Sequence, residues 1–341
     1  MLTPPVGLDA AVVAEAAARR WGLQVTLRYI AIGAGSYHWL GTAPVGTRYF
    51  LTVDDLQDKP WLGADPDQVF SGLCGAFETA LALRENAGLT FVVAPLAGRG
   101  GESGCRLTAR YSLAVFPFVS GLSGRWGDAV TAHDADALAE VLARLHLATP
   151  VVASRAPRRS FELYARAELE SAFAELDRPW SGGPFAERAR RELAAKADLV
   201  VGWLNEFDDL SAKLAARGAA AATVTHGEPH PGNFIRAGNG LALIDWDTVA
   251  LAPPERDLWM LDDGAPGALA RYSQLTGLRP DSDAISFYRL MWTLYDIASY
   301  TGDLRAAHTW SRDSEKAWAS LRLSLEPNPA ARPGPYRRPN S

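Results

Sequence analysis

The sequence predicts an α+β fold in two lobes, a small β-rich N-terminal lobe followed by a larger helical C-terminal lobe. Short apolar segments bounded by glycine and proline are typical of strands, and they dominate the first 119 residues. Longer segments with a helical pattern follow. Between them, the run FPFVSG at 116–121 takes a strand into a proline and small residues, as at a hinge. We therefore expect lobes at 1–119 and 120–326, and a disordered tail at 327–341.

The N-terminal lobe opens with a helix at 10–21, because Asp9 is a suitable N-cap and Gly22 follows the apolar pattern. A second helix is expected after the third strand, with Asp65 as its cap and Pro66 at its first position. Strands are expected at 25–32, 37–41, 48–53, 90–95 and 107–116.

A turn of small residues joins the first two strands and contains Gly33, Gly35 and Ser36. Backbone N–H groups in such a turn can approach phosphate oxygens without obstruction by a Cβ atom. Taken alone, these residues are explained better by a plain hairpin turn, so the turn by itself does not establish a phosphate site.

The C-terminal lobe is predicted to contain helices at 134–147, 161–177, 185–216, 283–300 and 308–325. The last two carry a set of aromatic and acidic residues that could receive an amine-rich ligand, namely Trp292, Tyr295, Asp296, Trp310, Glu315 and Trp318. At helical spacing, aromatic residues belong more often to a core than to a binding site.

Composition limits the classes of function. The 341 residues carry a formal net charge of −5, whereas binding of nucleic acid normally needs a basic face. No apolar run reaches the roughly 18 residues of a membrane span, and the start lacks the features of a signal peptide, so we expect a cytoplasmic protein with no membrane partner. The two cysteines, Cys74 and Cys105, have neither disulfide-framework nor metal-ligand spacing.

The stretch 226–247, HGEPHPGNFIRAGNGLALIDWD, concentrates polar residues of the kind that carry chemistry. Its prolines exclude a helix, and two strands at 234–236 and 241–244 joined by Gly-Asn-Gly form a predicted hairpin. Three polar side chains could then converge at one end of this hairpin: Glu228, Asn233 and Asp245. A carboxylate to orient a hydroxyl, with an amide and a second carboxylate to hold Mg²⁺, is what phosphoryl transfer requires.

The order His-Gly-acid, Asn and Ile-Asp resembles the signature of the aminoglycoside phosphotransferase and choline kinase family, small-molecule relatives of the protein kinases. The family pattern usually has Asp where this chain has Glu228, which is one methylene longer. The resemblance implies a protein-kinase-like fold and transfer of the γ-phosphoryl group of ATP or GTP. It also implies that the catalytic residues are Glu228, Asn233 and Asp245, and that the last two hold Mg²⁺.

The resemblance further assigns residues to the nucleotide site. The glycine turn, with Gly33, Gly35 and Ser36, would face the phosphates, and the backbone at Phe118 and Val119 would hold the purine. Asp257 would brace the catalytic loop.

The lysine that the family places on the third strand is absent, because Thr52 takes its position. The chain has four lysines, at 59, 196, 213 and 316, so Lys59 is the one candidate lysine of the N-terminal half. Arg48 and Arg28 are alternative cations, although arginine does not reproduce the compact ammonium group. Glu78, on the second helix, is a candidate partner for this cation.

The acceptor follows from the resemblance and from the acidic charge balance, which suits a cationic molecule. Together they imply a hydroxylated small molecule, first an aminoglycoside-type antibiotic and second a metabolite alcohol of the choline or homoserine kind. Thr52 and Glu228 keep open a catalytically weak nucleotide-binding protein. A transition-metal site at His226, Glu228 and His230 is a further interpretation, and Asp245 and Asp247 could simply be solvated turn residues. The oligomeric state stays open.

Overall fold

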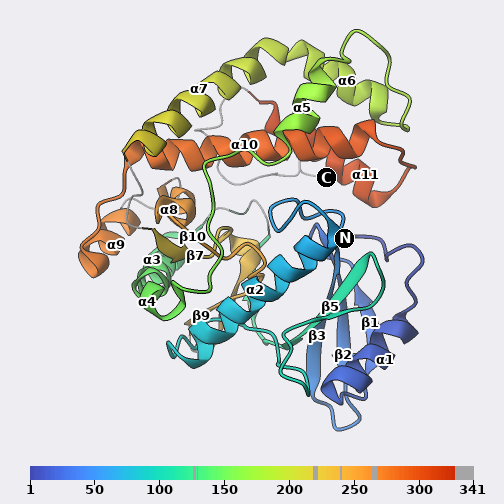
Figure 1. The fold of residues 1–341 in the computed structure, drawn as a ribbon, viewed down its shortest axis with the longest axis vertical. Helices are drawn as coiled ribbons and strands as arrows, with labels where there is room; N and C mark the ends of the chain where they lie inside the picture. Colours follow the sequence, from blue (N-terminus) through green and yellow to red (C-terminus); the bar gives the residue numbers. More distant parts are fainter. Residues whose placement is uncertain (126–127, 129, 218–221, 239, 263–266, 327–341) are drawn as a thin grey trace. The chain divides into compact units, whose positions relative to one another are not determined.

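The computed structural model describes residues 1–125, 128, 130–217, 222–238, 240–262 and 267–326. Its contacts group into two compact units. The first consists of Met1–Arg125, Glu140–Arg159 and Thr223–Ala252, and the second of Trp126–Ala139, Ser160–Ala222 and Pro253–Ser341. The predicted α+β class is confirmed, with an antiparallel sheet near the N-terminus and helices toward the C-terminus (Figure 1). The lobe boundary at 119 stays a prediction, and the tail at 327–341 lies outside the described residues.

The main sheet of the first unit has the strand order β1-β2-β3-β5-β4 in the described part of the chain. Its neighbouring strands are antiparallel, and their bounds are Thr26–Ile30 (β1), Ser36–Thr42 (β2), Arg48–Asp55 (β3), Cys105–Arg106 (β4) and Tyr111–Pro117 (β5). Helix α1, Ala10–Trp21, lies against one side of it (Figure 1). As predicted, Asp9 caps α1 and Gly22 ends it in the left-handed conformation at φ 73°.

Alternation along β2 and β3 separates an apolar face from a polar one. Trp39, Leu51 and Val53 pack with α1 in one core. The residues between them face the other way, and the register pairs Ser36 with Asp54 and His38 with Thr52. Helix α2, Pro66–Glu85, contributes Leu73 and Phe77 to a small cluster with Ala114 of β5. The polar face of the sheet therefore becomes enclosed.

Two predicted strands are wrong in detail. Residues 90–95 form no strand but one bridge, at Val92, because Phe91 and Val93 both bond Leu243 and the segment then leaves the ladder. The predicted strand at 107–116 is interrupted by a turn at 107–110, where the Thr108 hydroxyl accepts from the N–H groups of residues 110 and 111. A threonine turn of this kind is easily missed in a run of apolar and basic residues.

Two smaller sheets complete the first unit. The predicted hairpin is confirmed as β8, Phe234–Ala237, and β9, Gly240–Leu243, and β6, Leu122–Ser123, pairs with β8. Residue 239 of the turn lies outside the described residues. Strand β7, Thr223–Thr225, pairs with β10, Ala250–Ala252. Both sheets bracket the loop at 226–233, so they fix its two ends. The short helix α4 is Thr149–Val152, and α3, Ala132–Leu147, contributes residues to both units.

The second unit is helical. Its helices are α5 (Arg166–Phe173), α6 (Ala186–Ala195), α7 (Ala197–Ala216), α8 (Glu255–Asp262), α9 (Ala268–Thr276), α10 (Ser282–Arg305) and α11 (Arg312–Ser324). The long α10 contacts α5, α6, α7, α8 and α11 (Figure 1), and its Phe287, Leu294 and Ile297 are fully buried in a hydrophobic core of the second unit. The predicted helix at 161–177 is too long, since α5 begins only after Ala165, whose φ of 60° is left-handed. The helix predicted at 185–216 is broken at Lys196.

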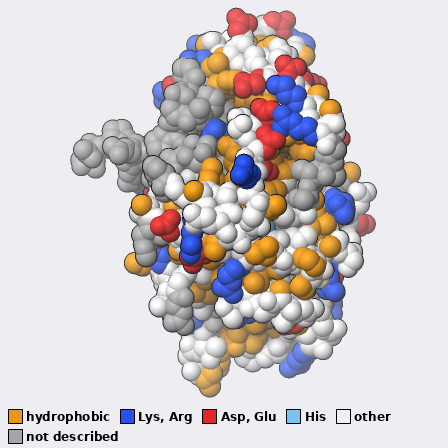
Figure 2. Space-filling model, turned by 90° about the vertical axis from the view of Figure 1, so that its left-hand side faces the viewer, with side chains coloured by type: hydrophobic (Ala, Val, Ile, Leu, Met, Phe, Trp, Pro, Cys, Tyr) orange, Lys and Arg blue, Asp and Glu red, His pale blue; other side chains and the backbone are white. Residues whose placement is uncertain are grey.

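No helix in the described ranges is long and apolar enough to cross a membrane. On the face drawn in Figure 2, basic and acidic side chains are interspersed with hydrophobic ones, and the basic ones do not merge into a continuous patch.

Candidate active site

The loop between β7 and β8 is organised by His226, which is fully buried. Its Nδ1 accepts a hydrogen bond from the N–H of Glu228 at 3.2 Å, so Nε2 carries the proton and donates to the carbonyl of Ile244 at 2.8 Å. Gly227 allows the tight bend through its φ of 102°. The ring edge of Trp246 lies against the imidazole at 4.7 Å between centroids. His226 therefore ties the loop to the end of the β8–β9 hairpin.

Asn233 ends this loop with its side chain buried. Its Nδ2 donates to the Glu228 carbonyl at 3.0 Å, and its own carbonyl accepts from the N–H of Ile244 at 2.9 Å. The amide is thereby oriented, and Oδ1 remains as the acceptor. Because Ile244 precedes Asp245, an amide oxygen and a carboxylate are supplied from neighbouring chain segments. Hard oxygen donors of this kind suit Mg²⁺.

The Glu228 side chain is partly accessible, and Oε2 lies 3.9 Å from His230 Nε2. Burial, together with the nearby His226 ring, lowers the pKa of His230 to about 3. His230 is therefore neutral near pH 7 and does not neutralise Glu228. Its Nδ1 accepts from the Gly232 N–H at 3.0 Å, which shows that the ring serves the backbone of the loop.

Lys59 lies in the connection after β3 and is 2% exposed. Its Nζ lies 2.5 Å from Asp247 Oδ2, 3.1 Å from Asp54 Oδ1 and 3.2 Å from Ser36 Oγ. The hydroxyl of Ser36 in turn donates to Asp54 Oδ1 at 2.7 Å. Burial by itself would lower the pKa of Lys59, but Asp247 and then Asp54 outweigh it and hold that pKa well above its ordinary value. Lys59 is accordingly a charged ammonium at all physiological pH values.

Asp245 follows β9 in a left-handed conformation, with φ 67°. Such a conformation is uncommon for a residue other than glycine and occurs often at functional sites. Water reaches the Asp245 side chain, yet the protein around it and the charge of Asp247 raise its pKa to about 7. Three carboxylates, those of Asp54, Asp245 and Asp247, thus share one ammonium group, and the site has an excess of negative charge that a divalent cation would balance.

The glycine turn directly precedes Ser36, which lies opposite Asp54 in the register of β2 and β3. Gly33 and Gly35 have φ values of 75° and 76°, which favour glycine. A Cβ atom on Gly33 would lie 3.3 Å from Nε2 of His38. Burial lowers the pKa of His38 to about 3, and its Nδ1 is 3.3 Å from the hydroxyl of Thr52. The position where a strand lysine was expected therefore holds a neutral Thr–His pair.

The alternative cations and partners lie elsewhere. Arg48 begins β3, at the end opposite Asp54, and covers the half-buried ring of Phe118 at 4.0 Å. Its guanidinium also donates to Ser120 at 3.1 Å. Arg28 is exposed on β1. Glu78 is exposed on α2, and among the described residues it forms no ion pair with Lys59, so the predicted partnership is wrong.

The transition-metal interpretation of His226, Glu228 and His230 is also wrong for the described residues, which contain no group of three or more His, Cys, Asp or Glu side chains suited to a metal. The reason is that both ring nitrogens of His226 are used in backbone hydrogen bonds. The roles predicted for Phe118, Val119 and Asp257 stay predictions; Val119 is half-buried and Asp257 is fully buried at the start of α8.

Sequence reasoning missed Asp54 and Asp247 as partners of Lys59. Both are buried, so Asp247 is not a solvated turn residue. A signal for Asp54 did exist, since it is an acid at the end of an alternating strand on the face of Thr52. Asp247 lies 188 residues from Lys59 in sequence, and no local pattern connects them.

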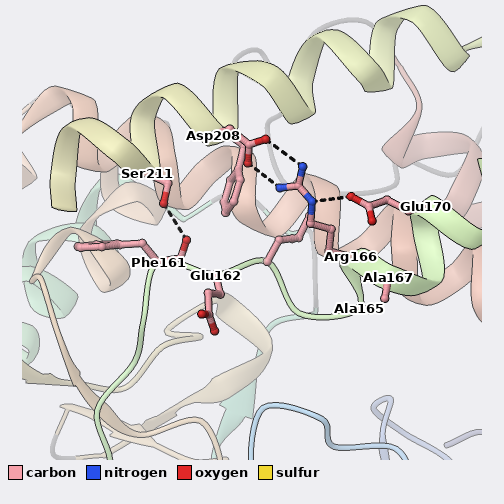
Figure 3. Close-up of a pocket in the computed structure, with 10 residues that line it drawn as sticks. Phe161, Glu162, Ala165, Arg166, Ala167, Glu170, Asp208 and Ser211 are labelled. Carbon is pink, nitrogen blue, oxygen red and sulfur yellow. Dashed lines mark hydrogen bonds and ion pairs between the residues drawn. The ribbon is translucent and has the colours of Figure 1, made fainter. Parts of the chain in front are cut away.

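A separate cavity of about 590 Å³ lies in the second unit, between the segment before α5 and helix α7. Figure 3 shows Arg166 between Asp208 and Glu170, with distances of 2.5 and 2.7 Å to their nearest oxygens. Glu162 points away from this trio and accepts from Ser160 at 3.0 Å. The carboxylates of Glu170 on α5 and Asp208 on α7 are therefore already paired with a cation.

Comparisons with known proteins found a matching family, a related sequence and similar solved structures. The model of a family described as "Phosphotransferase enzyme family" matches residues 39–288. Protein StrN of Streptomyces griseus is 32% identical over 270 residues, which cover 75% of this chain and 78% of that protein. Among solved structures, a spectinomycin phosphotransferase in complex with ADP and spectinomycin has a TM-score of 0.73 at 17% identity, covering 94% of this chain and 96% of the other. A choline kinase from Streptococcus pneumoniae has a TM-score of 0.54 at 16% identity, covering 92% and 98%.

Proposed function

Because the chain belongs to the phosphotransferase enzyme family and is a small-molecule phosphotransferase, we propose that it moves the γ-phosphoryl group of ATP to a hydroxyl of an aminoglycoside-type antibiotic. The observation that carries the proposal is the buried ammonium of Lys59, held between Asp54 and Asp247 beside Asp245. A charged lysine among several carboxylates has little value for stability alone, since removing such charges from water is costly. It is well suited to a site that receives phosphates and a metal ion.

Glu228 is the proposed carboxylate for the acceptor. Its side chain is partly accessible, and the neutral ring of His230 lies 3.9 Å from its Oε2. The new bond joins the acceptor oxygen to the γ-phosphorus, the bond from that phosphorus to the β–γ bridging oxygen breaks, and ADP leaves. Glu228 orients the hydroxyl and accepts its proton. His226 and the Asn233 amide, which both bond the backbone of the loop at residue 228, keep that loop in one conformation.

Asn233 and Asp245 are the residues that would hold Mg²⁺, which neutralises phosphate charge when bound. The raised pKa of Asp245 fits this assignment, because a carboxylate surrounded by other carboxylates gains most from a nearby cation. Lys59 would contact the phosphates in place of the strand lysine. The N–H groups of the turn at Gly33 and Gly35 would approach the same phosphates.

ATP is the proposed donor because three similar structures contain the adenine nucleotides ADP, AMP and AMP-PNP. An antibiotic is the proposed acceptor because those structures include enzymes for spectinomycin, macrolides and amicoumacin. A small cationic alcohol is the second candidate, supported by the choline kinase. The chain's net charge of −5 suits cationic members of both classes.

The experiment is ATP consumption by the purified protein with Mg²⁺, against a panel of aminoglycosides, spectinomycin, macrolides and choline, with products followed by mass. The expected result is an antibiotic heavier by one phosphoryl group. Glu228→Gln should lower turnover by about a hundredfold or more and leave nucleotide binding intact. Glu78→Gln is the matched control, because Glu78 is exposed on α2. A phosphorylated choline with no antibiotic product would replace the first acceptor by the second.

A further inference from the structure

The cation of this site comes from an unusual part of the chain. Thr52 occupies the strand position where a lysine was expected, and Lys59 reaches the site from the connection after β3. A lysine on such a connection lacks the rigid backbone that a strand would supply. Something else has to hold its ammonium group in place.

Asp54 is the residue that can do so. It lies on β3, two positions after Thr52 and on the same face of the sheet, and it is 2% exposed. Asp54 Oδ1 is 3.1 Å from Lys59 Nζ, and both groups contact the Ser36 hydroxyl, at 2.7 and 3.2 Å. Ser36 begins β2 directly opposite Asp54 in the register. Two neighbouring strands therefore present a carboxylate and a hydroxyl to the same ammonium group.

A structural role by itself explains Asp54 poorly. Within the described part of the chain, no group donates a hydrogen bond to Asp54 Oδ2, although the atom is buried. The hydroxyl of Ser112, which is opposite Asp54 on β5, is likewise buried without a hydrogen-bond partner there. A buried carboxylate with an unsatisfied oxygen costs stability, and an amide or apolar side chain would cost less. The charge of Asp54 is what a neutral residue could not replace.

We propose that Asp54 is the positioning residue for Lys59, which it holds at the phosphate site from the strand side. The inference rests on the proposed function, in which Lys59 contacts the nucleotide. Asp247 holds the same ammonium group from the turn after β9, at 2.5 Å. When phosphates draw Lys59 away from Asp247, Asp54 and Ser36 keep it charged and oriented. Asp54, which lies on β3 itself, thus holds the lysine in place, the role that the family resemblance would give to Glu78 on α2.

The first arm of the test measures the reactivity of Lys59 and does not depend on activity. The wild-type protein is treated with an amine-acylating ester at pH 8, and the four lysines are followed by peptide mass. Asp54→Asn should make Lys59 react about tenfold faster relative to the exposed Lys213, because one of the two carboxylates that hold the ammonium group is lost. Glu78→Gln is the matched control, because Glu78 is an exposed acid on α2 that forms no ion pair with Lys59 among the described residues.

The second arm measures the affinity for a non-hydrolysable ATP analogue with Mg²⁺. Asp54→Asn should weaken it about tenfold, and Asp54→Glu, which restores the charge, should recover part of the loss. If Asp54→Asn does not fold, Ser36→Ala replaces it, with a smaller shift in both arms. Equal Lys59 reactivity and equal affinity in Asp54→Asn and Glu78→Gln would overturn the proposal. Failure of the wild type to bind the analogue would instead count against the proposed function, and the first arm would still decide the role of Asp54.

Discussion

Two regions of the molecule each hold a cation between two carboxylates, but the two arrangements serve different purposes. In the first unit, Lys59 lies between Asp54 and Asp247 with 2% of its side chain exposed. In the second, Arg166 lies between Asp208 and Glu170, and the side chains are 35%, 48% and 57% exposed. The buried trio of Lys59, Asp54 and Asp247 has a further carboxylate, Asp245, beside it. In the exposed trio of Arg166, Asp208 and Glu170, solvent screens the charges.

The two regions differ in whether their cation is fixed to one partner or can exchange partners. The two-fold contact of the Arg166 guanidinium with Asp208 is a fixed, geometrically specific clamp between α5 and α7. Lys59 is a compact charge that can exchange one oxygen partner for another. Burial makes its interactions strong, and the surplus of carboxylates leaves the site short of cations. We infer that the exposed region serves structure and the buried one serves phosphate chemistry.

The largest expected effect comes from Asp245→Ala. Removing a proposed ligand of Mg²⁺ should reduce phosphoryl transfer by on the order of a thousandfold, because the charge that forms in the transition state loses its stabilisation. Asp208→Ala in the exposed trio should leave the rate within about twofold of wild type. The measurement is the steady-state rate of phosphoryl transfer by both variants with the same acceptor. An equal loss of rate in the two variants would contradict the difference between the two regions.

Acid should protonate His230, in the loop at 226–233, before it protonates the carboxylates of the exposed trio. The folded-state pKa of His230 is about 3 against an ordinary value of 6.5. The stabilisation from its neutral form is thus complete above pH 6.5 and is lost as pH falls toward 3. At pH 5 the expected loss from this one group is about 2 kcal/mol. Asp208, whose pKa Arg166 lowers, gives stabilisation that is lost only below its ordinary 3.8.

Urea unfolding at pH 8 and pH 5 measures this effect. His230→Asn keeps an acceptor for the Gly232 N–H and should lose part of the pH dependence. Hydrogen exchange at pH 5 should increase first in β7 to β9 and later in α5 to α7. An equal pH dependence in wild type and His230→Asn would contradict the assignment of a neutral His230.

Lys59→Arg sharpens the contrast between the two cations. The guanidinium keeps the charge but is larger and planar, so it cannot occupy the point between Asp54, Asp247 and Ser36 without displacing one of them. The affinity for MgATP should fall by about tenfold. Titration calorimetry checks this, and unchanged affinity would indicate that the geometry of the ammonium group is unimportant.

The smallest effect is expected from Arg166→Gln. Exposed ion pairs contribute little, so the free energy of unfolding should fall by about 1 kcal/mol or less. Nucleotide affinity should be unchanged. Thermal unfolding with and without MgATP measures both quantities, and a large loss of nucleotide affinity would link this trio to the site.

The sequence allowed good prediction where the determining interactions are local. The Asp9 and Asp65 caps and the Gly-rich turn between β8 and β9 are signals within a few residues, and the corresponding helices and hairpin lie where they were expected. The turn made by the Thr108 hydroxyl is local too, but its residues are not those usually associated with turns. The strand expected at 90–95 failed because its apolar pattern reflects burial and not pairing.

The candidate site was predictable only in part. Lys59 was recognised because lysine is scarce, yet it could not be separated from Arg48 or Arg28. Its partners depend on contacts between distant segments, such as the one that joins Lys59 to Asp247. The alternation along β3 predicts the face of the strand on which Asp54 lies. It does not predict which cation contacts Asp54.

The most direct test of the central claim is the MgATP affinity of Lys59→Met compared with that of Thr52→Lys/Lys59→Met. If Lys59 is the displaced phosphate-binding cation, the single variant should bind at least tenfold more weakly than wild type, since it loses a direct charge contact. Restoring a lysine on β3 in the double variant should recover part of that affinity. Wild-type affinity in Lys59→Met would contradict the claim that this buried lysine serves the nucleotide.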